Sequence, residues 1–196
     1  MPDPQQLELP TELHTARMLL RPFRQHDAPA LHEAIAESID NLRLHLGHLP
    51  WVATTPTLEA AQIRCRQAEA SFLLRTDLPF LAFHRDSGKL VASIGLHRTD
   101  WSIPRTEVGY WVRSSELGKG YASEGVDALV AWALNDLHMA RIELVTDEQN
   151  RGSRAVAARC GFVLEGIHRN ASLGTDGTLR HHCMYARYSN GHVHGD

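Results

Sequence analysis

Apolar residues recur along the chain at two different spacings, and these spacings predict its helices and strands. Steps of three and four residues, which gather side chains on one face of a helix, run over 26–38, 57–75 and 123–137. A shorter segment with the same spacing, 151–162, contains Gly161 near its end, a residue type common just after a helix. Leu42, Leu46 and Leu49 repeat more weakly within 39–51 and predict a short helix and a loop.

Short apolar runs bounded by turn residues predict seven strands. They lie at 17–23, 78–85, 90–100, 106–113, 139–150, 162–169 and 180–188, the second and third joined as a hairpin by the turn "DSGK". Strands and helices in this mixed order favour a layered α/β (α+β) fold. A chain of 196 residues, 43% hydrophobic, can bury one full core. We therefore expect one domain over 1–196, with its core at about 12–188 and short polar tails.

Charge and hydropathy exclude several partner classes. The net charge is −3 and basic residues are scattered, so neither nucleic acid nor an anionic membrane surface is an expected partner. No apolar run approaches the roughly 20 residues of a membrane span, and the first residues lack the pattern of a signal peptide. The three cysteines are far apart and form no C-x-x-C pair, which is typical of reduced structural thiols. These features predict a cytoplasmic protein.

The 13 histidines raise the question of a metal site. His181 and His182 are neighbours on a predicted strand, so their side chains point to opposite faces. The final "GHVHGD" is a polar chain end. We therefore predict no metal site.

The stretch "ELGKGYASEG", residues 116–125, places two glycines around a lysine just before a predicted helix. The first N–H groups of a helix lack partners within it, and its dipole attracts negative charge. Gly118 and Gly120 would let backbone amides approach a phosphate, and Lys119 would add positive charge. An ordinary strand-to-helix turn would explain the same glycines. Their spacing matches neither the phosphate loop of kinases nor the dinucleotide fingerprint of dehydrogenases.

Segments around this loop carry a family resemblance. The order glycine loop, helix, strand and "NRGSRAVAARCGFVLEG" (150–166) resembles the Gcn5-related N-acetyltransferase (GNAT) superfamily. With "VGYWV", "GKGYASE" and "MYAR", the chain is similar over nearly its whole length to the RimJ/RimL group of ribosomal-protein N-terminal acetyltransferases. The resemblance implies a twisted mixed sheet of about seven strands, flanked by helices. One strand pair would splay open to hold acetyl-CoA, the acyl donor, and no metal would take part.

The resemblance also implies which residues contact the cofactor. The family's phosphate loop maps onto Leu117, Gly118, Lys119, Gly120, Tyr121 and Ala122. Leu117 replaces the usual Gln or Arg, which should weaken the site without abolishing it, because backbone amides make most of the contacts. Tyr110, Trp111, Val112 and Arg113 would offer main-chain groups to the pantetheine arm, or else serve as plain core sheet. Asn150 would hold the cofactor's amide region, or else be a turn residue at a strand end.

Acetyl transfer needs a neutral amine, a hydrogen-bond donor for the oxyanion and a proton for the departing thiolate. The tyrosine that many family members use as the acid is replaced here by Ala157, but Ser153 matches the serine of the RimJ/RimL group. Ser153 is therefore the expected acid, with a helix-capping role as the alternative. Some members of the group carry a glutamate where Ser172 stands. Glu107 is then the provisional base, unless it only pairs with a neighbouring cation.

The resemblance thus implies an N-acetyltransferase that transfers the acetyl group directly to a primary amine. An α-amine has a pKa near 8 and a lysine amine one near 10.4, so roughly a tenth of α-amines are neutral at pH 7 and a weak base suffices. A protein N-terminus is the expected acceptor, and Leu46, His48 and Trp51 are possible walls of its groove or members of a satellite hydrophobic cluster. Two alternatives stay open. The chain could acetylate a polyamine, an amino acid or an antibiotic, or could bind acyl-CoA as a sensor without catalysis. Either a monomer or a homodimer is compatible with the sequence.

Overall fold

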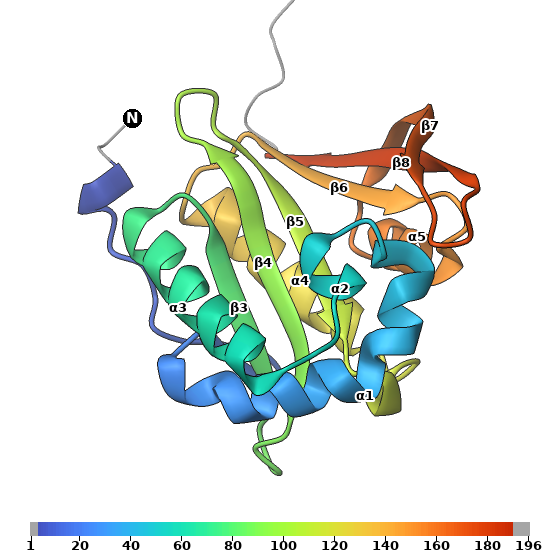
Figure 1. Ribbon diagram of the computed structural model, residues 1–196. Coiled ribbons are helices and arrows are strands. Elements are labelled where there is room, and N and C mark those ends of the chain that lie inside the picture. The colour runs from blue at the N-terminus through green and yellow to red at the C-terminus, as the bar shows by residue number, and fades with distance from the viewer. Residues whose placement is uncertain (1–3, 190–196) are drawn as a thin grey trace, which may run out of the picture.

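An eight-stranded sheet runs through the computed structural model, which describes residues 4–189 (Figure 1). The strand order is β1-β2-β3-β4-β5-β6-β8-β7, and every neighbouring pair is antiparallel except β5 and β6. The strands are β1 (Leu13–His14), β2 (Met18–Pro22), β3 (Leu78–His84), β4 (Leu90–Asp100), β5 (Arg105–Val112), β6 (Arg141–Asp147), β7 (Val163–Leu173) and β8 (Leu179–Tyr188). The strand beyond the predicted seven is the two-residue β1.

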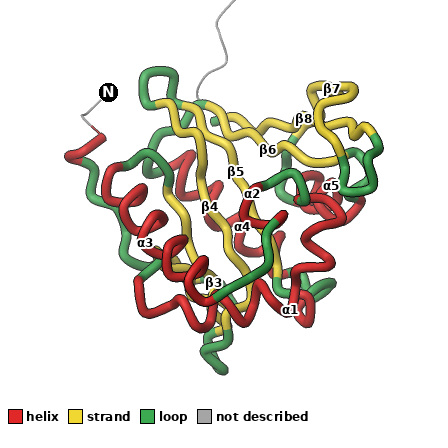
Figure 2. Tube along the Cα trace, viewed as in Figure 1, coloured by secondary structure: helices red, strands yellow, loops and turns green. Residues whose placement is uncertain are grey.

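Helices cover both faces of this sheet (Figures 1 and 2). The α-helices are α1 (Ala28–Leu46), α2 (Pro50–Ala53), α3 (Leu58–Leu74), α4 (Tyr121–Asn135) and α5 (Arg151–Arg159), and single turns of 3-10 helix are η1 (Pro4–Gln6), η2 (Gln25–Asp27) and η3 (Ser114–Glu116). Helices α1, α2 and α3 lie on one face, and α4 and α5 on the other. The expected layered architecture is therefore confirmed.

Two hydrophobic clusters fill the layers, and β5 contributes to both. Val108 and Val112 join the cluster under α4, whereas Trp111 joins the cluster under α1 and α3. Side chains alternate between the two faces of a strand, so these memberships fix which way each β5 residue points. Tyr110 packs against the α4 cluster, and Glu107 shares the face of Trp111.

Helix α1 differs from the prediction, because it continues to Leu46 without the expected break near residue 38. Its buried face includes Leu31, Ile35, Ser38 and Leu42, which keep helical spacing through a polar position. The Ser38 hydroxyl accepts a hydrogen bond from the Ser114 amide at 2.9 Å. A distant segment thus satisfies the polar group that interrupted the apolar pattern.

The central pair of strands separates partway along its length (Figure 1). β5 and β6 pair only through Arg105, Thr106 and Glu107, which lie opposite Arg141, Ile142 and Glu143. Beyond Glu107, β5 stays paired with β4 while β6 stays paired with β8. We call the space between the diverging ends of β5 and β6 the split. Its presence at one strand pair agrees with the expectation.

Candidate active site

The glycine loop leads from η3 into α4, beside the split. Gly118 has φ +75° and Gly120 has φ +86°, both in the left-handed region that favours glycine. Within residues 4–189, the amides of Gly118, Lys119 and Gly120 donate to no protein acceptor. Gly120 is also the N-cap of α4, which adds the unpaired first amides of that helix. The loop is therefore a cluster of free donors suited to an anion.

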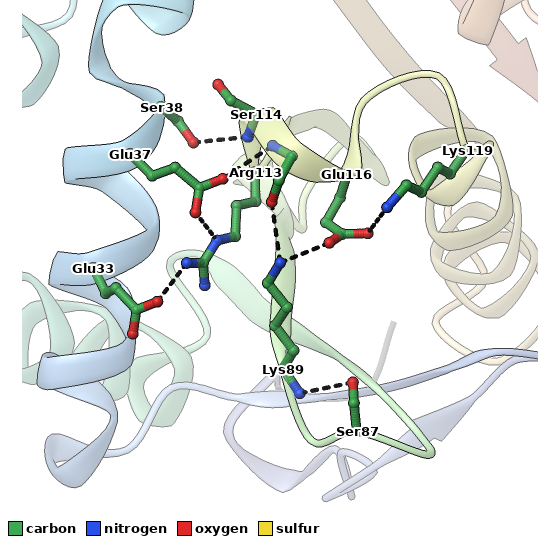
Figure 3. Close-up of polar contacts among 10 residues, drawn as sticks. Glu33, Glu37, Ser38, Ser87, Lys89, Arg113, Ser114, Glu116 and Lys119 are labelled. Atoms are coloured by element: carbon green, nitrogen blue, oxygen red, sulfur yellow. Dashed lines mark hydrogen bonds and ion pairs between the residues drawn. The ribbon is translucent and has the colours of Figure 1, made fainter.

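Side chains around the loop fix its shape and balance its charge (Figure 3). Glu116 accepts hydrogen bonds from Lys89 at 2.7 Å and from Lys119 at 2.8 Å. Lys119, predicted to supply positive charge to a phosphate, is thus already paired. Arg17, just before β2, donates to the Lys119 carbonyl at 2.9 Å and pairs with Glu124 of α4 at 2.7 Å. Sequence reasoning missed Arg17, because its contacts join segments about a hundred residues apart.

The residues just before the loop are attached to α1 (Figure 3). The buried Arg113 guanidinium pairs with Glu33 and, at 2.5 Å, with Glu37. The Ser115 amide donates to Glu37 at 2.9 Å. Burial raises the pKa of Glu37, but the hydrogen bonds from Ser115 and Arg113 and the Arg113 charge outweigh it and lower this pKa to about 2. Helix α1 therefore holds the start of the glycine loop through ionised groups.

Main-chain groups along β5 divide between β4 and the split. The Arg113 amide donates to the Val91 carbonyl at 2.8 Å. In an antiparallel pair, alternate residues direct both main-chain groups to the same neighbour. The main-chain groups of Trp111 therefore serve the β4 ladder, and the Arg113 carbonyl accepts from the Glu116 amide at 2.9 Å. Neither residue has main-chain groups free for a ligand, contrary to the expectation for these two. The groups of Tyr110 and Val112 face the split, where no strand pairs with them.

The expected acid, Ser153, lies at the start of α5, on the other side of the split. Asn150 is the N-cap of α5, and its side-chain oxygen accepts from the Ser153 amide at 3.0 Å. The Ser153 hydroxyl lies 2.8 Å from the Tyr110 hydroxyl and does not cap the helix, so its capping alternative is wrong. Burial raises the pKa of Tyr110 to about 12, against the opposing effect of the Ser153 hydrogen bond. The sequence indicated Tyr110 only for its main chain and did not reveal this contact.

The provisional base, Glu107, is held by a cation. A register shift in β4 between His97 and Asp100 frees Arg98, whose guanidinium pairs with the Glu107 carboxylate at 2.5 Å. Burial raises the pKa of Glu107, while the charge and hydrogen bond of Arg98 act against this. The alternative of an ion pair is confirmed. Glu143 lies directly opposite on β6, so the two carboxylates line one small pocket with Arg98.

The residues predicted to line the acceptor groove have two kinds of surroundings. Leu46 and Trp51 pack against the cluster under α1 and α3, as the hydrophobic-cluster alternative states. The His48 ring lies 6.0 Å from the ring of His182 on β8. The hydroxyl of Ser172 on β7 lies 2.9 Å from Nε2 of the same histidine. A polar surface of β7 and β8 therefore faces the segment between α1 and α2.

Two structural features are absent from residues 4–189. No helix in this part of the chain is long and apolar enough to cross a membrane. No group of three or more His, Cys, Asp or Glu side chains there is arranged to hold a metal ion.

Comparisons with known proteins identify the family of this chain. The profile described as "Acetyltransferase (GNAT) domain" matches residues 17–163. The chain is 25% identical over 157 residues to the uncharacterized N-acetyltransferase YoaA of Bacillus subtilis, covering 80% of this chain and 85% of YoaA. It is 30% identical over 97 residues to the ribosomal-protein-serine acetyltransferase of Escherichia coli, about half of each chain.

Solved structures agree on the fold. RimL, a ribosomal L7/L12 α-N-protein acetyltransferase in complex with coenzyme A, superposes with a TM-score of 0.83 at 21% identity, covering 90% of this chain and 97% of RimL. The microcin C7 self-immunity acetyltransferase MccE, in complex with acetyl-CoA and AMP, gives 0.80 at 20% identity, covering 88% and 93%. Because the family profile spans most of the chain, this protein belongs to the GNAT acetyltransferases and is an acyltransferase.

Proposed function

We propose that the protein transfers the acetyl group of acetyl-CoA to the α-amine of a protein N-terminus. The observation that carries the proposal is the meeting of two features at the split. Free amides at Gly118, Lys119 and Gly120 suit a pyrophosphate, and a serine hydroxyl at the start of α5 lies where β5 and β6 diverge. The ribosomal-protein acetyltransferases among the similar proteins support the choice of a protein acceptor.

The residues of the split have distinct roles in this proposal. The loop amides would bind the pyrophosphate, and the main-chain groups of Tyr110 and Val112 would pair with the pantetheine arm as a neighbouring strand does. The Asn150 side-chain nitrogen has no acceptor among residues 4–189 and would bind an amide carbonyl of the arm. When bound, acetyl-CoA supplies a thioester that an amine can attack.

Ser153 would give its proton to the departing sulfur. Its hydroxyl touches Tyr110, so the phenol can replace the proton that the serine loses. The raised pKa of Tyr110 keeps the phenol protonated at neutral pH, as a donor requires. The role of Glu107 as base stays a prediction, since its carboxylate is engaged by Arg98.

A second acceptor class has specific support. MccE, which shares the fold, was solved with AMP bound beside acetyl-CoA. That complex supports an acceptor other than a protein for this fold, although Arg98 and Arg141 already pair with Glu107 and Glu143 here. A small-molecule acceptor is therefore the alternative.

The test measures thiol release from acetyl-CoA with peptides that begin with serine or alanine and with a panel of small amines. Ser153→Ala is the active-site variant, and Ser87→Ala, in the distant β3–β4 turn, is the matched control. We expect release with the peptides, loss of at least about 100-fold in Ser153→Ala, and unchanged acetyl-CoA affinity by calorimetry. Release with small amines alone would replace the protein acceptor by the alternative. Acetyl-CoA binding without release from any amine would contradict catalysis and favour an acyl-CoA sensor.

A further inference from the structure

The proposed reaction needs a group that takes a proton from the acceptor amine. Ser172 of β7 and His182 of β8 meet near the segment between α1 and α2. Serine does not accept a proton at neutral pH by itself, but here its hydroxyl lies 2.9 Å from Nε2 of His182. The hydroxyl can donate to an unprotonated Nε2, which leaves its oxygen free to accept from an ammonium group.

The position of His182 along the sheet matches that of the acid. His182 on β8 lies opposite Asp147, the last residue of β6. Asn150 donates its amide to the Asp147 carbonyl at 2.9 Å, so α5 and Ser153 begin directly after this pair. His182 therefore lies one strand beyond β6, level with the end of the split from which the acid is presented.

Glu107 lies nearer than Tyr110 to the paired end of β5 and β6. Ser153 contacts β5 at Tyr110, three residues past Glu107, which is about 10 Å along a strand. On the opposite strand, Asp147 lies four residues past Glu143, the partner of Glu107, or about 13 Å. Both the acid and His182 are thus at the open end of the split, whereas Glu107 is at its closed end and paired with Arg98.

Burial and two neighbouring histidines favour the neutral form of the His182 imidazole, and one carboxylate acts against them. Burial lowers the pKa of His182, the charge of His48 lowers it further, and His168 on β7 acts in the same direction. The carboxylate of Asp147 opposes them. Asp147 is shared with His45 of α1, 3.5 Å away, and accepts the Gln149 amide at 2.8 Å. A neutral imidazole at pH 7 is the form that can accept a proton.

We propose that His182 is the general base of this enzyme and that Ser172 passes the proton to it. The ammonium group of the acceptor donates one proton to the Ser172 oxygen as the serine hydroxyl donates its own to Nε2. The neutral amine then attacks the thioester carbon, the carbon–sulfur bond breaks, and the sulfur takes a proton from Ser153. The imidazolium releases its proton to solvent. The nitrogen of the new amide releases one proton, which reaches Ser153 through Tyr110, so that both sides of the site return to their starting state. This inference rests on the proposed function.

The test is the pH dependence of kcat/KM for one acceptor peptide from pH 5.5 to 9.5, in wild type and His182→Ala. In wild type we expect the acid limb to bend below pH 6.5. In His182→Ala the rate should fall about 10- to 100-fold at pH 7 and should rise about tenfold per pH unit until the amine itself deprotonates near pH 8. Ser172→Ala should lose about tenfold at pH 7 in the same direction, since it interrupts the proton path.

Three further variants make the result decisive. His181→Ala removes the adjacent imidazole, which points to the other face of β8 and binds the Asn170 amide, and should keep the wild-type profile. His182→Gln keeps a hydrogen-bonding partner for Ser172 but cannot titrate, so it replaces the alanine variant if that one loses acetyl-CoA binding. An unchanged profile in both His182 variants would overturn the inference, as would Glu107→Gln reproducing the predicted loss. If wild type acetylates no amine, the proposed function and this inference both fail. Activity in wild type with unaffected His182 variants refutes the base assignment alone.

Discussion

The link between α1 and the glycine loop gives a prediction about stability at low pH. Glu37→Gln keeps the shape of the side chain but removes its charge, and so breaks the ion pair with Arg113. In the folded protein the pKa of Glu37 is lowered from 4.5 to about 2. At 1.36 kcal/mol per pKa unit, that difference corresponds to about 3 kcal/mol. The side chain is 31% exposed, so we take about half of this value, 1.5 kcal/mol, to allow for screening by solvent.

The sign of the pH dependence follows from the lowered pKa. A carboxylate whose folded pKa is below its unfolded pKa stabilises the protein fully above the unfolded value. Its contribution disappears as the pH falls toward the folded value, because Glu37 then becomes a neutral acid much like glutamine. The variant should therefore be about 1.5 kcal/mol less stable than wild type at pH 7, and the difference should shrink between pH 4.5 and about 2.

Urea unfolding of both proteins at several pH values between 3 and 7 measures this difference directly. In thermal unfolding at pH 7, the melting temperature of Glu37→Gln should be about 3 to 6 °C below that of wild type, as expected for a chain of this size. Glu33→Gln is the matched control. It contacts the same guanidinium, but its side chain is 69% exposed, so its loss should be below about 1 kcal/mol. A Glu37→Gln difference that stays constant from pH 7 to pH 3 would refute the reasoning.

The remaining predictions concern the site and the core beneath it. Gly120→Ala places a side chain at φ +86°, which should cost about 1 kcal/mol and weaken acetyl-CoA binding at least about tenfold by calorimetry; unchanged affinity would argue against an anion site at this loop. Tyr110→Phe should lower kcat about tenfold at constant acetyl-CoA affinity, because Ser153 loses its proton donor, whereas an unaltered kcat would remove the phenol from the proton path. In Gly125→Ala the new Cβ would clash with Cδ1 of Ile94 and should cost about 1–3 kcal/mol in urea unfolding. Adding Ile94→Val removes that methyl group and should recover part of the loss, and strictly additive effects would show that the clash is absent.

Local patterns in the sequence predicted most elements, because each records a face that must be buried. The predicted helix over 57–75 corresponds to α3, and the hairpin around "DSGK" to β3 and β4. The sequence predicts a helix that ends at residue 38, whereas α1 continues past it with Ser38 buried on its face. Its hydrogen-bond partner is Ser114, 76 residues away, and no local pattern encodes such a contact.

The candidate site was also only partly predictable from the sequence. The turn at Gly118 and Gly120 is predictable, since a positive φ restricts the residue type at a single position. The contact of Tyr110 with Ser153 and that of Ser172 with His182 depend on how strands align in space. So does the pairing of Glu107 with Arg98, which requires a register shift in β4.

The short pairing of β5 with β6 has a consequence for the folded state as a whole. Three residue pairs are the only ladder between the β1–β5 and β6–β8 parts of the described sheet. A pantetheine arm in the split would act as a temporary strand across this weak line and would join the two parts. At a concentration 100 times its dissociation constant, such a ligand stabilises the fold by about 2.7 kcal/mol. We therefore expect the supply of acyl donor to govern how readily the sheet opens along this line, and hence how quickly a protease destroys the protein.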